Sequence, residues 1–346
     1  MTKKASSPTL EQWKRLYELM DEIKGLAPWQ YMYEHNMFGI RFPETGELGF
    51  VSVMGNLGEH LAVAVYIGKR GFEGFWTMQR LGYDLTPDVV LQIPQVQASL
   101  EDREFITSED RKVIKQLNLK FRGKNAWPQF RSYRPGCFPW YLEEEEAQIL
   151  AVGLEQLLDV APRFQNNPDL LAPQDSRGIH LVRVFEDGKW TEQHQEIKFP
   201  PDPPLQLKMD PEALEHLKTL SRRNSIVEID LQMMDQAVQE DKSERPYFPF
   251  LLMIADKQSQ MILGADLLSP LPSLESMWES LPAVFTAILA GHPLPKEVQT
   301  KDSLISLLLS PLEKELGIRV RLVSRLPTID HAKREFNRFM DRSSNS

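Results

Sequence analysis

The spacing of hydrophobic residues changes several times along the chain, and each change marks an expected helix or strand. Near the start, apolar residues three or four positions apart predict an amphipathic helix that begins at Ser7-Pro8 and ends before Gly25. Three segments with strand character follow, separated by the turn-rich sequences PETGE and GNLGE: 38–42, 48–54 and 60–67. The short turns between them predict an antiparallel meander.

The rest of the N-terminal half mixes helix and strand signals without a regular order. The pattern predicts a helix over 71–81, a strand over 96–100 and a short helix from Ser108. Four consecutive glutamates at 143–146 precede a helical pattern, so we interpret them as negative charge at a helix N-terminus and not as a metal site. An Asp-Gly pair at 187–188 between strand-like flanks predicts a hairpin. This half is therefore expected to be an α+β domain.

A proline-rich stretch, FPPDPP at 199–204, separates the two halves. Proline removes a backbone donor and disrupts helix interiors and central strands, so we place a linker between an N-terminal domain over 1–198 and a C-terminal domain over 205–342. After a helix that begins at Asp210-Pro211, the C-terminal half is expected to follow the order βββαβαβα, as an α/β domain. The expected strands and helices are 226–231, 249–255, 260–267, helix 274–290, 296–300, helix 303–316, 318–323 and helix 328–340.

Composition and charge narrow the class of protein. The length of 346 residues suits two domains, and the fractions of hydrophobic (42%) and charged (26%) residues are typical of folded proteins. The single cysteine, Cys137, excludes an internal disulfide and a multi-cysteine zinc site. The net charge of −9 opposes general attraction to nucleic acid. No apolar run approaches the ~20 residues of a membrane helix, and the start MTKKASS lacks a signal segment, so we expect a cytoplasmic protein without membrane contact.

Several distinctive strings carry a resemblance to known sequences. They are LAPWQYMY, PETGELGFVSVMGNLGE followed by VYIGKRGFEGF, and LKFRGKNAWPQFRSYRPGCFPWYL. Through them the N-terminal half resembles an uncharacterised bacterial family known as a domain of unknown function. The C-terminal half resembles a second such domain, and its element order is similar to the topology of the ribonuclease H-like fold. The first resemblance implies a bacterial protein, and neither implies an established activity.

The ribonuclease H-like topology suggests where a metal site would lie. Active members of that fold hold two divalent cations with carboxylates on the first strand, after the fourth strand and on a late helix. Asp230, Asp302 and Glu335 occupy these approximate places and would bind Mg²⁺ or Mn²⁺ as catalytic residues. Each also has a purely structural interpretation: Asp230 as a solvated strand residue beside Glu228, Asp302 as a helix N-cap, and Glu335 as a surface residue.

A second candidate site is the basic and aromatic segment from Lys120 to Tyr141. Arginines and aromatic rings without an intervening acid are typical of surfaces that bind single-stranded nucleic acid, nucleotides or protein partners. The candidate binding residues are Trp127, Arg131, Arg134 and Trp140. The prolines and glycines of the segment favour a long ordered loop whose aromatic rings pack onto the domain, with the two arginines exposed.

Two functional hypotheses follow. The first is a non-catalytic binding or interaction protein of the bacterial cytoplasm that needs no cofactor and binds a protein partner or single-stranded nucleic acid. The alternative is a nuclease or related phosphoryl-transfer enzyme that depends on Mg²⁺ or Mn²⁺. Phosphate-binding loops, dinucleotide fingerprints and nucleophile-elbow motifs are absent from the sequence, which leaves NTPase, dehydrogenase and serine hydrolase activities without support.

Overall fold

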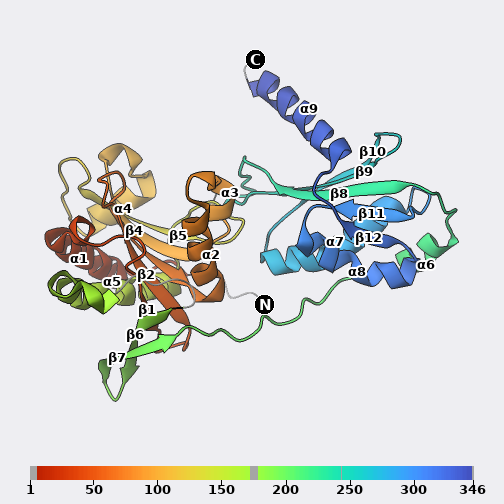
Figure 1. Ribbon diagram of the computed structural model, residues 1–346. Helices are drawn as coiled ribbons and strands as arrows, with labels where there is room; N and C mark the ends of the chain where they lie inside the picture. The colour runs from red at the N-terminus through yellow and green to blue at the C-terminus, as the bar shows by residue number, and fades with distance from the viewer. Residues whose placement is uncertain (1–5, 172–177, 243, 345–346) are drawn as a thin grey trace. The chain divides into compact units, whose positions relative to one another are not determined.

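The computed structural model describes residues 6–171, 178–242 and 244–344 (Figure 1), with the side chains of the last helix described only in part. The chain divides into two compact units, Met1–Pro201 and Asp202–Ser346, and the division lies inside the proline-rich stretch. Each unit contains one mixed sheet with helices, so the α+β two-domain architecture is confirmed. Among the described residues, no helix combines the length and apolar character needed to cross a bilayer.

The N-terminal unit is built on a seven-stranded sheet of order β5-β4-β3-β2-β1-β6-β7. Neighbouring strands are antiparallel except β1 and β6, which are parallel. The strands are β1 (Phe38–Arg41), β2 (Leu48–Met54), β3 (Ala62–Ile67), β4 (Gln95–Glu101), β5 (Trp127–Tyr133), β6 (Ile179–Glu186) and β7 (Lys189–Glu196). The α-helices are α1 (Leu10–Leu26), α2 (Gly68–Leu81), α3 (Pro87–Val90), α4 (Ser108–Gln116) and α5 (Glu144–Asn166). Short 3₁₀ helices are η1 (Pro28–Gln30), η2 (Gly82–Asp84), η3 (Arg103–Phe105) and η4 (Pro168–Leu171).

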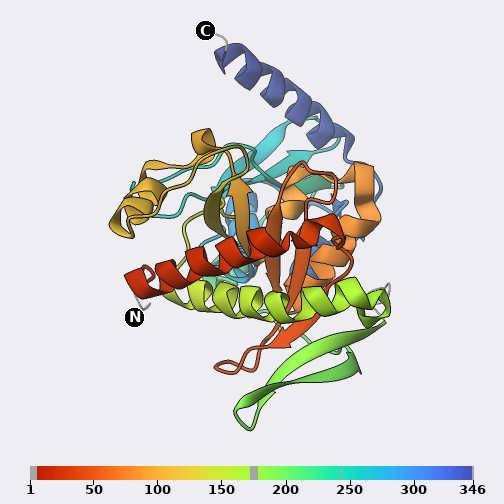
Figure 2. The same ribbon diagram turned by 90° about the vertical axis from the view of Figure 1, so that its left-hand side faces the viewer.

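The two faces of this sheet differ in polarity. Helices α1 and α5 lie side by side across one face (Figure 2), where the alternate valines of β2 and β3 form the main core. Gly153 allows the close approach, because a Cβ atom there would lie 2.5 Å from Val65 Cγ2. Helix α2 covers part of the other face with Phe72, Phe75 and Trp76. Beyond α2 this second face is polar, since β4 and β5 place glutamine, arginine and tyrosine side chains there.

Most expected elements of the N-terminal unit are present, and the meander of β1, β2 and β3 is confirmed. The helix starts are corrected: the N-cap of α1 is Thr9, not Ser7, and the N-cap of α4 is Thr107, not Ser108. In both helices the threonine hydroxyl accepts the backbone N–H three residues later, whose own side chain reaches back to the threonine N–H. The expected loop over 120–141 is also corrected, because 127–133 is strand β5. The sequence did not predict this strand because Pro128 is typical of a loop. Proline is nevertheless tolerated in an edge strand such as β5.

The C-terminal unit has the expected element order βββαβαβα after its first helix. Its elements are α6 (Pro211–Thr219), β8 (Ile226–Met233), β9 (Phe250–Asp256), β10 (Ile262–Leu268), α7 (Leu274–Leu289), β11 (Glu297–Thr300), α8 (Ser303–Leu316), β12 (Arg319–Leu322) and α9 (Pro327–Ser344). The sheet order is β10-β9-β8-β11-β12, with β8 antiparallel to β9 and parallel to β11. The similarity to the ribonuclease H-like fold is one of topology and stays a prediction.

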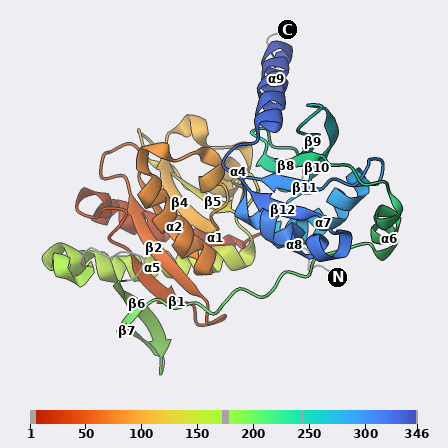
Figure 3. The same ribbon diagram turned by 45° about the vertical axis from the view of Figure 1, so that its right-hand side comes forward.

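Helices cover the two faces of this second sheet unequally (Figure 3). Helices α6, α7 and α8 bury one face in a large hydrophobic core. On the other face, Leu326, just before α9, and Ile329, in its first turn, pack against Met253 and Ala255. The start of α9 therefore lies over the central strands, beside the outward-facing side chains of β8.

Candidate functional site

The predicted carboxylate set begins on β8, which lies beside β11 as the metal hypothesis requires. The Asp230 side chain is buried, with 3% exposure, and its Oδ2 lies 2.5 Å from Lys333 Nζ and 3.2 Å from Lys301 Nζ. The interpretation of Asp230 as a solvated strand residue was therefore wrong. Two ammonium groups already neutralise the carboxylate, and a metal ion would have to displace them.

Glu228, two residues earlier on β8, is also buried and has a role that the sequence did not reveal. Its Oε2 accepts the backbone N–H groups of Thr328 and Ile329, at 2.9 and 3.1 Å. These donors belong to the first turn of α9, where unpaired amides and the helix dipole favour a negative charge. Polar residues at alternate positions of β8 suggested a face in water, but α9 covers that face and supplies partners for both carboxylates.

The other two predicted metal ligands have the local contacts of structural residues. The Asp302 side chain accepts the backbone N–H of Leu304 at 2.7 Å as the N-cap of α8. Glu335 forms an exposed ion pair with Arg338 on its own helix. Within the described parts of the chain, no group of three or more histidine, cysteine or acidic side chains could hold a metal ion. Metal binding by Asp230, Asp302 and Glu335 thus stays a prediction, and the described residues form no cluster that supports it.

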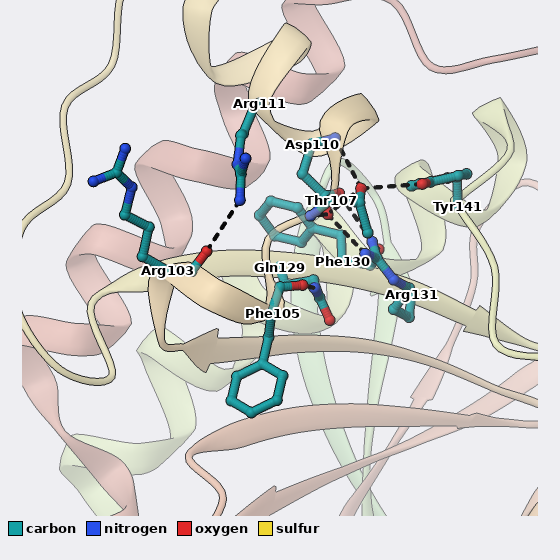
Figure 4. Close-up of polar contacts among 9 residues, drawn as sticks. All are labelled: Arg103, Phe105, Thr107, Asp110, Arg111, Gln129, Phe130, Arg131 and Tyr141. Carbon is teal, nitrogen blue, oxygen red and sulfur yellow. Dashed lines mark hydrogen bonds and ion pairs between the residues drawn. The ribbon is translucent and has the colours of Figure 1, made fainter.

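The basic and aromatic segment forms an internal polar network around Arg131 (Figure 4). The Arg131 guanidinium donates two hydrogen bonds to Asp110, at 2.7 and 3.0 Å, and lies 4.9 Å from the centroid of the Tyr141 ring. Asp110 also accepts the backbone N–H of Thr107, and the Tyr141 hydroxyl donates to the Thr107 hydroxyl. The Arg131 side chain is only 12% exposed, so its expected exposure was wrong. The network joins β5 to the start of α4.

The remaining residues of that segment also have internal partners. The Arg134 guanidinium contacts Glu143 and Glu146, which belong to the acidic run at the start of α5. The half-buried Trp127 packs edge-on against Phe121, and Trp140 packs against the adjacent tyrosine ring. The expected packing of aromatic rings onto the domain is thus seen for Trp127, which packs against the main core of the unit. A ligand or partner role for these residues stays a prediction.

A cleft on the polar face of the N-terminal sheet was not predicted from the sequence. Its floor is a row of three directly paired residues, Tyr66 on β3, Gln95 on β4 and Tyr133 on β5. Paired residues on neighbouring strands point to the same side of a sheet, so the two tyrosines flank the glutamine amide. The cleft has a volume of about 440 Å³, and an adjoining hollow of about 350 Å³ shares Glu34 and His60 with it.

The three side chains of the floor lack hydrogen-bond partners within the described residues. Tyr66 is 3% exposed, Gln95 is 5% exposed and Tyr133 is half-buried, and the polar ends of the three side chains border the cleft instead of a sealed interior. Polar groups in such a position can pair with water or with a bound ligand. Burial, followed by the nearby Glu34 carboxylate and Tyr133, raises the pKa of Tyr66, and burial also raises the pKa of Tyr133. Both phenols therefore stay protonated near neutral pH.

The walls of the cleft combine apolar and polar side chains. Four apolar residues line the walls. They are Met54 at the end of β2, Met78 in α2, Leu85 after η2 and Val90 at the end of α3. At the mouth, the Glu34 carboxylate accepts a hydrogen bond of 3.1 Å from Gln79 Nε2. His60 Nε2 lies 2.6 Å from Gln97 Nε2, and its Nδ1 lies 3.8 Å from a Glu101 oxygen. If the amide donates, the histidine proton resides on Nδ1 and faces the carboxylate.

Comparison with known sequences gives two matches that together span most of the chain. Residues 13–183 match a domain of unknown function (DUF7309), and residues 213–337 match another domain of unknown function (DUF6930). A search of curated proteins gave no match. The first match contains the whole cleft, and the second contains β8 and most of α9. The chain thus carries two domains of unknown function and fits an uncharacterised two-domain family.

Proposed function

We propose that this chain is a non-catalytic binding protein of the bacterial cytoplasm, and that its N-terminal cleft holds the ligand. The main support is the row of polar groups on the floor of the cleft, formed by Tyr66, Gln95 and Tyr133, which have no hydrogen-bond partner among the described residues. These groups border the cleft, where water can reach them. A ligand that displaces this water must hydrogen-bond with them in its place, because each polar group left buried and unpaired costs about 1–3 kcal/mol. Three neighbouring strands hold the groups in fixed positions, which favours a ligand whose polar atoms match them.

The charged depression near the basic segment supports binding less well. It has a volume of about 560 Å³ and is lined by both acidic and basic side chains, namely Asp102, Arg103, Glu104, Arg111 and Lys124. It is wide open, and its charges are solvated and of mixed sign. The cleft is less open, and side chains from three neighbouring strands form its floor, which makes the cleft the stronger candidate.

A ligand screen read out by thermal unfolding tests the proposal. Compounds that raise the melting temperature of the wild-type chain should lose part of that effect in Tyr66→Phe and retain it in Tyr141→Phe. The second variant is a matched control, because the Tyr141 hydroxyl is hydrogen-bonded to Thr107, outside the cleft. Equal effects of every stabilising compound on both variants would contradict a ligand site at the cleft.

The alternative proposal is a metal-dependent phosphoryl-transfer enzyme that uses Asp230, Asp302 and Glu335. The adjacency of β8 and β11 favours it, whereas the lysine contacts of Asp230 oppose it. Calorimetric titration with Mn²⁺ separates the two proposals. Saturable heat that disappears in Asp230→Ala would favour the enzyme.

A further inference from the structure

We propose that the cleft binds a small organic cation, a primary amine with a short apolar or aromatic body. This inference rests on the proposed binding function and specifies the class of ligand. It is drawn from the charge, the hydrogen-bonding capacity and the apolar surface of the lining residues.

The charge of the lining favours a cationic ligand over an anionic one. Glu34 lines both the cleft and the adjoining hollow, and Glu59 lines the hollow. Neither lysine nor arginine is found among the described residues that line the two. A phosphate or carboxylate entering here would lose hydration without meeting an opposite charge, which is strongly unfavourable. An ammonium group would meet the Glu34 carboxylate at the mouth.

The floor supplies acceptors for such a group. An ammonium ion carries three donors and no acceptor, so it needs oxygen atoms arranged around it. The phenol oxygens of Tyr66 and Tyr133 and the carbonyl oxygen of Gln95 are unpaired and lie in one cross-strand row. In the hollow, the Tyr33 ring stacks on the His35 ring with centroids 5.7 Å apart. The exposed tyrosine face there adds a surface that attracts cations.

The apolar walls determine the rest of the ligand. The side chains of Met54 and Met78 face the cleft, and methionine adapts to irregular apolar shapes. Leu85, after η2, and Val90, at the end of α3, complete the apolar wall. A bare ammonium or metal ion would leave this wall in contact with water. An amine with an aromatic or short aliphatic body would bury it.

Three probes of nearly equal size test the class of ligand by calorimetry on the full chain. Tyramine carries an ammonium group, tyrosol a neutral hydroxyl, and 4-hydroxyphenylacetate a carboxylate on the same phenol. We expect tyramine to bind more tightly than tyrosol by about threefold, within the range for a partly exposed charge pair, and 4-hydroxyphenylacetate to bind weakest. In Glu34→Gln the preference for tyramine should disappear, whereas Glu44→Gln, in the β1–β2 turn outside the cleft, should keep it.

The outcomes separate the two proposals. If tyrosol or 4-hydroxyphenylacetate binds as tightly as tyramine, and Tyr66→Phe weakens that binding, the inference of a cation is overturned and the binding function stands. If a preference for tyramine persists unchanged in Glu34→Gln, the inference is also overturned. If none of the probes binds while other compounds stabilise the chain through the cleft, the inference alone falls. If no compound acts through the cleft, both proposals fall.

Discussion

Removing the Tyr66 hydroxyl should leave the N-terminal unit as stable as before or make it more stable, although the residue is buried. In Tyr66→Phe the ring and its packing against Phe75 remain, with ring centroids 5.1 Å apart in the wild type. The substitution removes a hydroxyl that borders the cleft and has no hydrogen-bond partner among the described residues. A fully buried unpaired group costs about 1–3 kcal/mol. Because this hydroxyl borders a cleft that water can enter, we expect a gain of about 0–1 kcal/mol.

The matched substitution Tyr141→Phe should have the opposite sign. The Tyr141 hydroxyl donates a hydrogen bond of 3.0 Å to the Thr107 hydroxyl, so its removal should cost about 0.5–1.5 kcal/mol, the usual net value of one hydrogen bond. Urea unfolding followed by tryptophan fluorescence measures both variants on the same transition, since both residues lie in the N-terminal unit. An equal loss of stability in both variants would refute the reasoning, because the Tyr66 hydroxyl would then have a partner.

Three further predictions concern residues outside the cleft. Arg131→Ala should destabilise the N-terminal unit by about 3 kcal/mol in urea unfolding, because it leaves the largely buried Asp110 carboxylate without its charge partner, whereas the exposed Arg111→Ala should change little. Similar small changes in both variants would contradict the buried network. Hydrogen bonds from Arg163 and Arg183 lower the pKa of Glu192 to about 2. The stability that this carboxylate provides should therefore be present above pH ~4.5 and lost as the pH falls from ~4.5 to ~2. Glu192→Gln should remove that part of the acid dependence of unfolding. Asp302→Ala should cost about 1 kcal/mol in thermal unfolding as the loss of an N-cap, and Glu335→Ala nearly nothing. The reverse order would contradict both structural interpretations.

Much of the fold was predictable from the sequence because each helix or strand shows its own hydrophobic periodicity within one short segment of the chain. The meander and the order βββαβαβα needed only local spacing and turn residues. Strand β5 was missed because Pro128 suggests a loop, and the strand becomes evident only when its edge position is known. The helix caps at Thr9 and Thr107 differ from the predicted positions because several neighbouring residues could cap, and only the backbone geometry selects one.

The candidate sites were less predictable because they depend on partners that are distant in the sequence. The pattern around Arg131 indicated a surface, yet Asp110 pairs with it from another element. The cleft had only a weak signal, the polar residues at alternate positions of β4. That alternation predicts one polar face. It does not show that Gln95 aligns with tyrosines from two neighbouring strands, because strand register is a tertiary property.

The contact between Glu228 and α9 has a consequence for the order in which the C-terminal domain is completed during synthesis. The amides that pair with this carboxylate lie one hundred residues further along the chain. Until they emerge from the ribosome, Lys257 is the charged group beside this carboxylate, with its Nζ 3.9 Å from Oε1, and water must pair with the oxygen that later contacts α9. A chain interrupted before Pro327 would therefore leave this face of the sheet uncovered and hydrated.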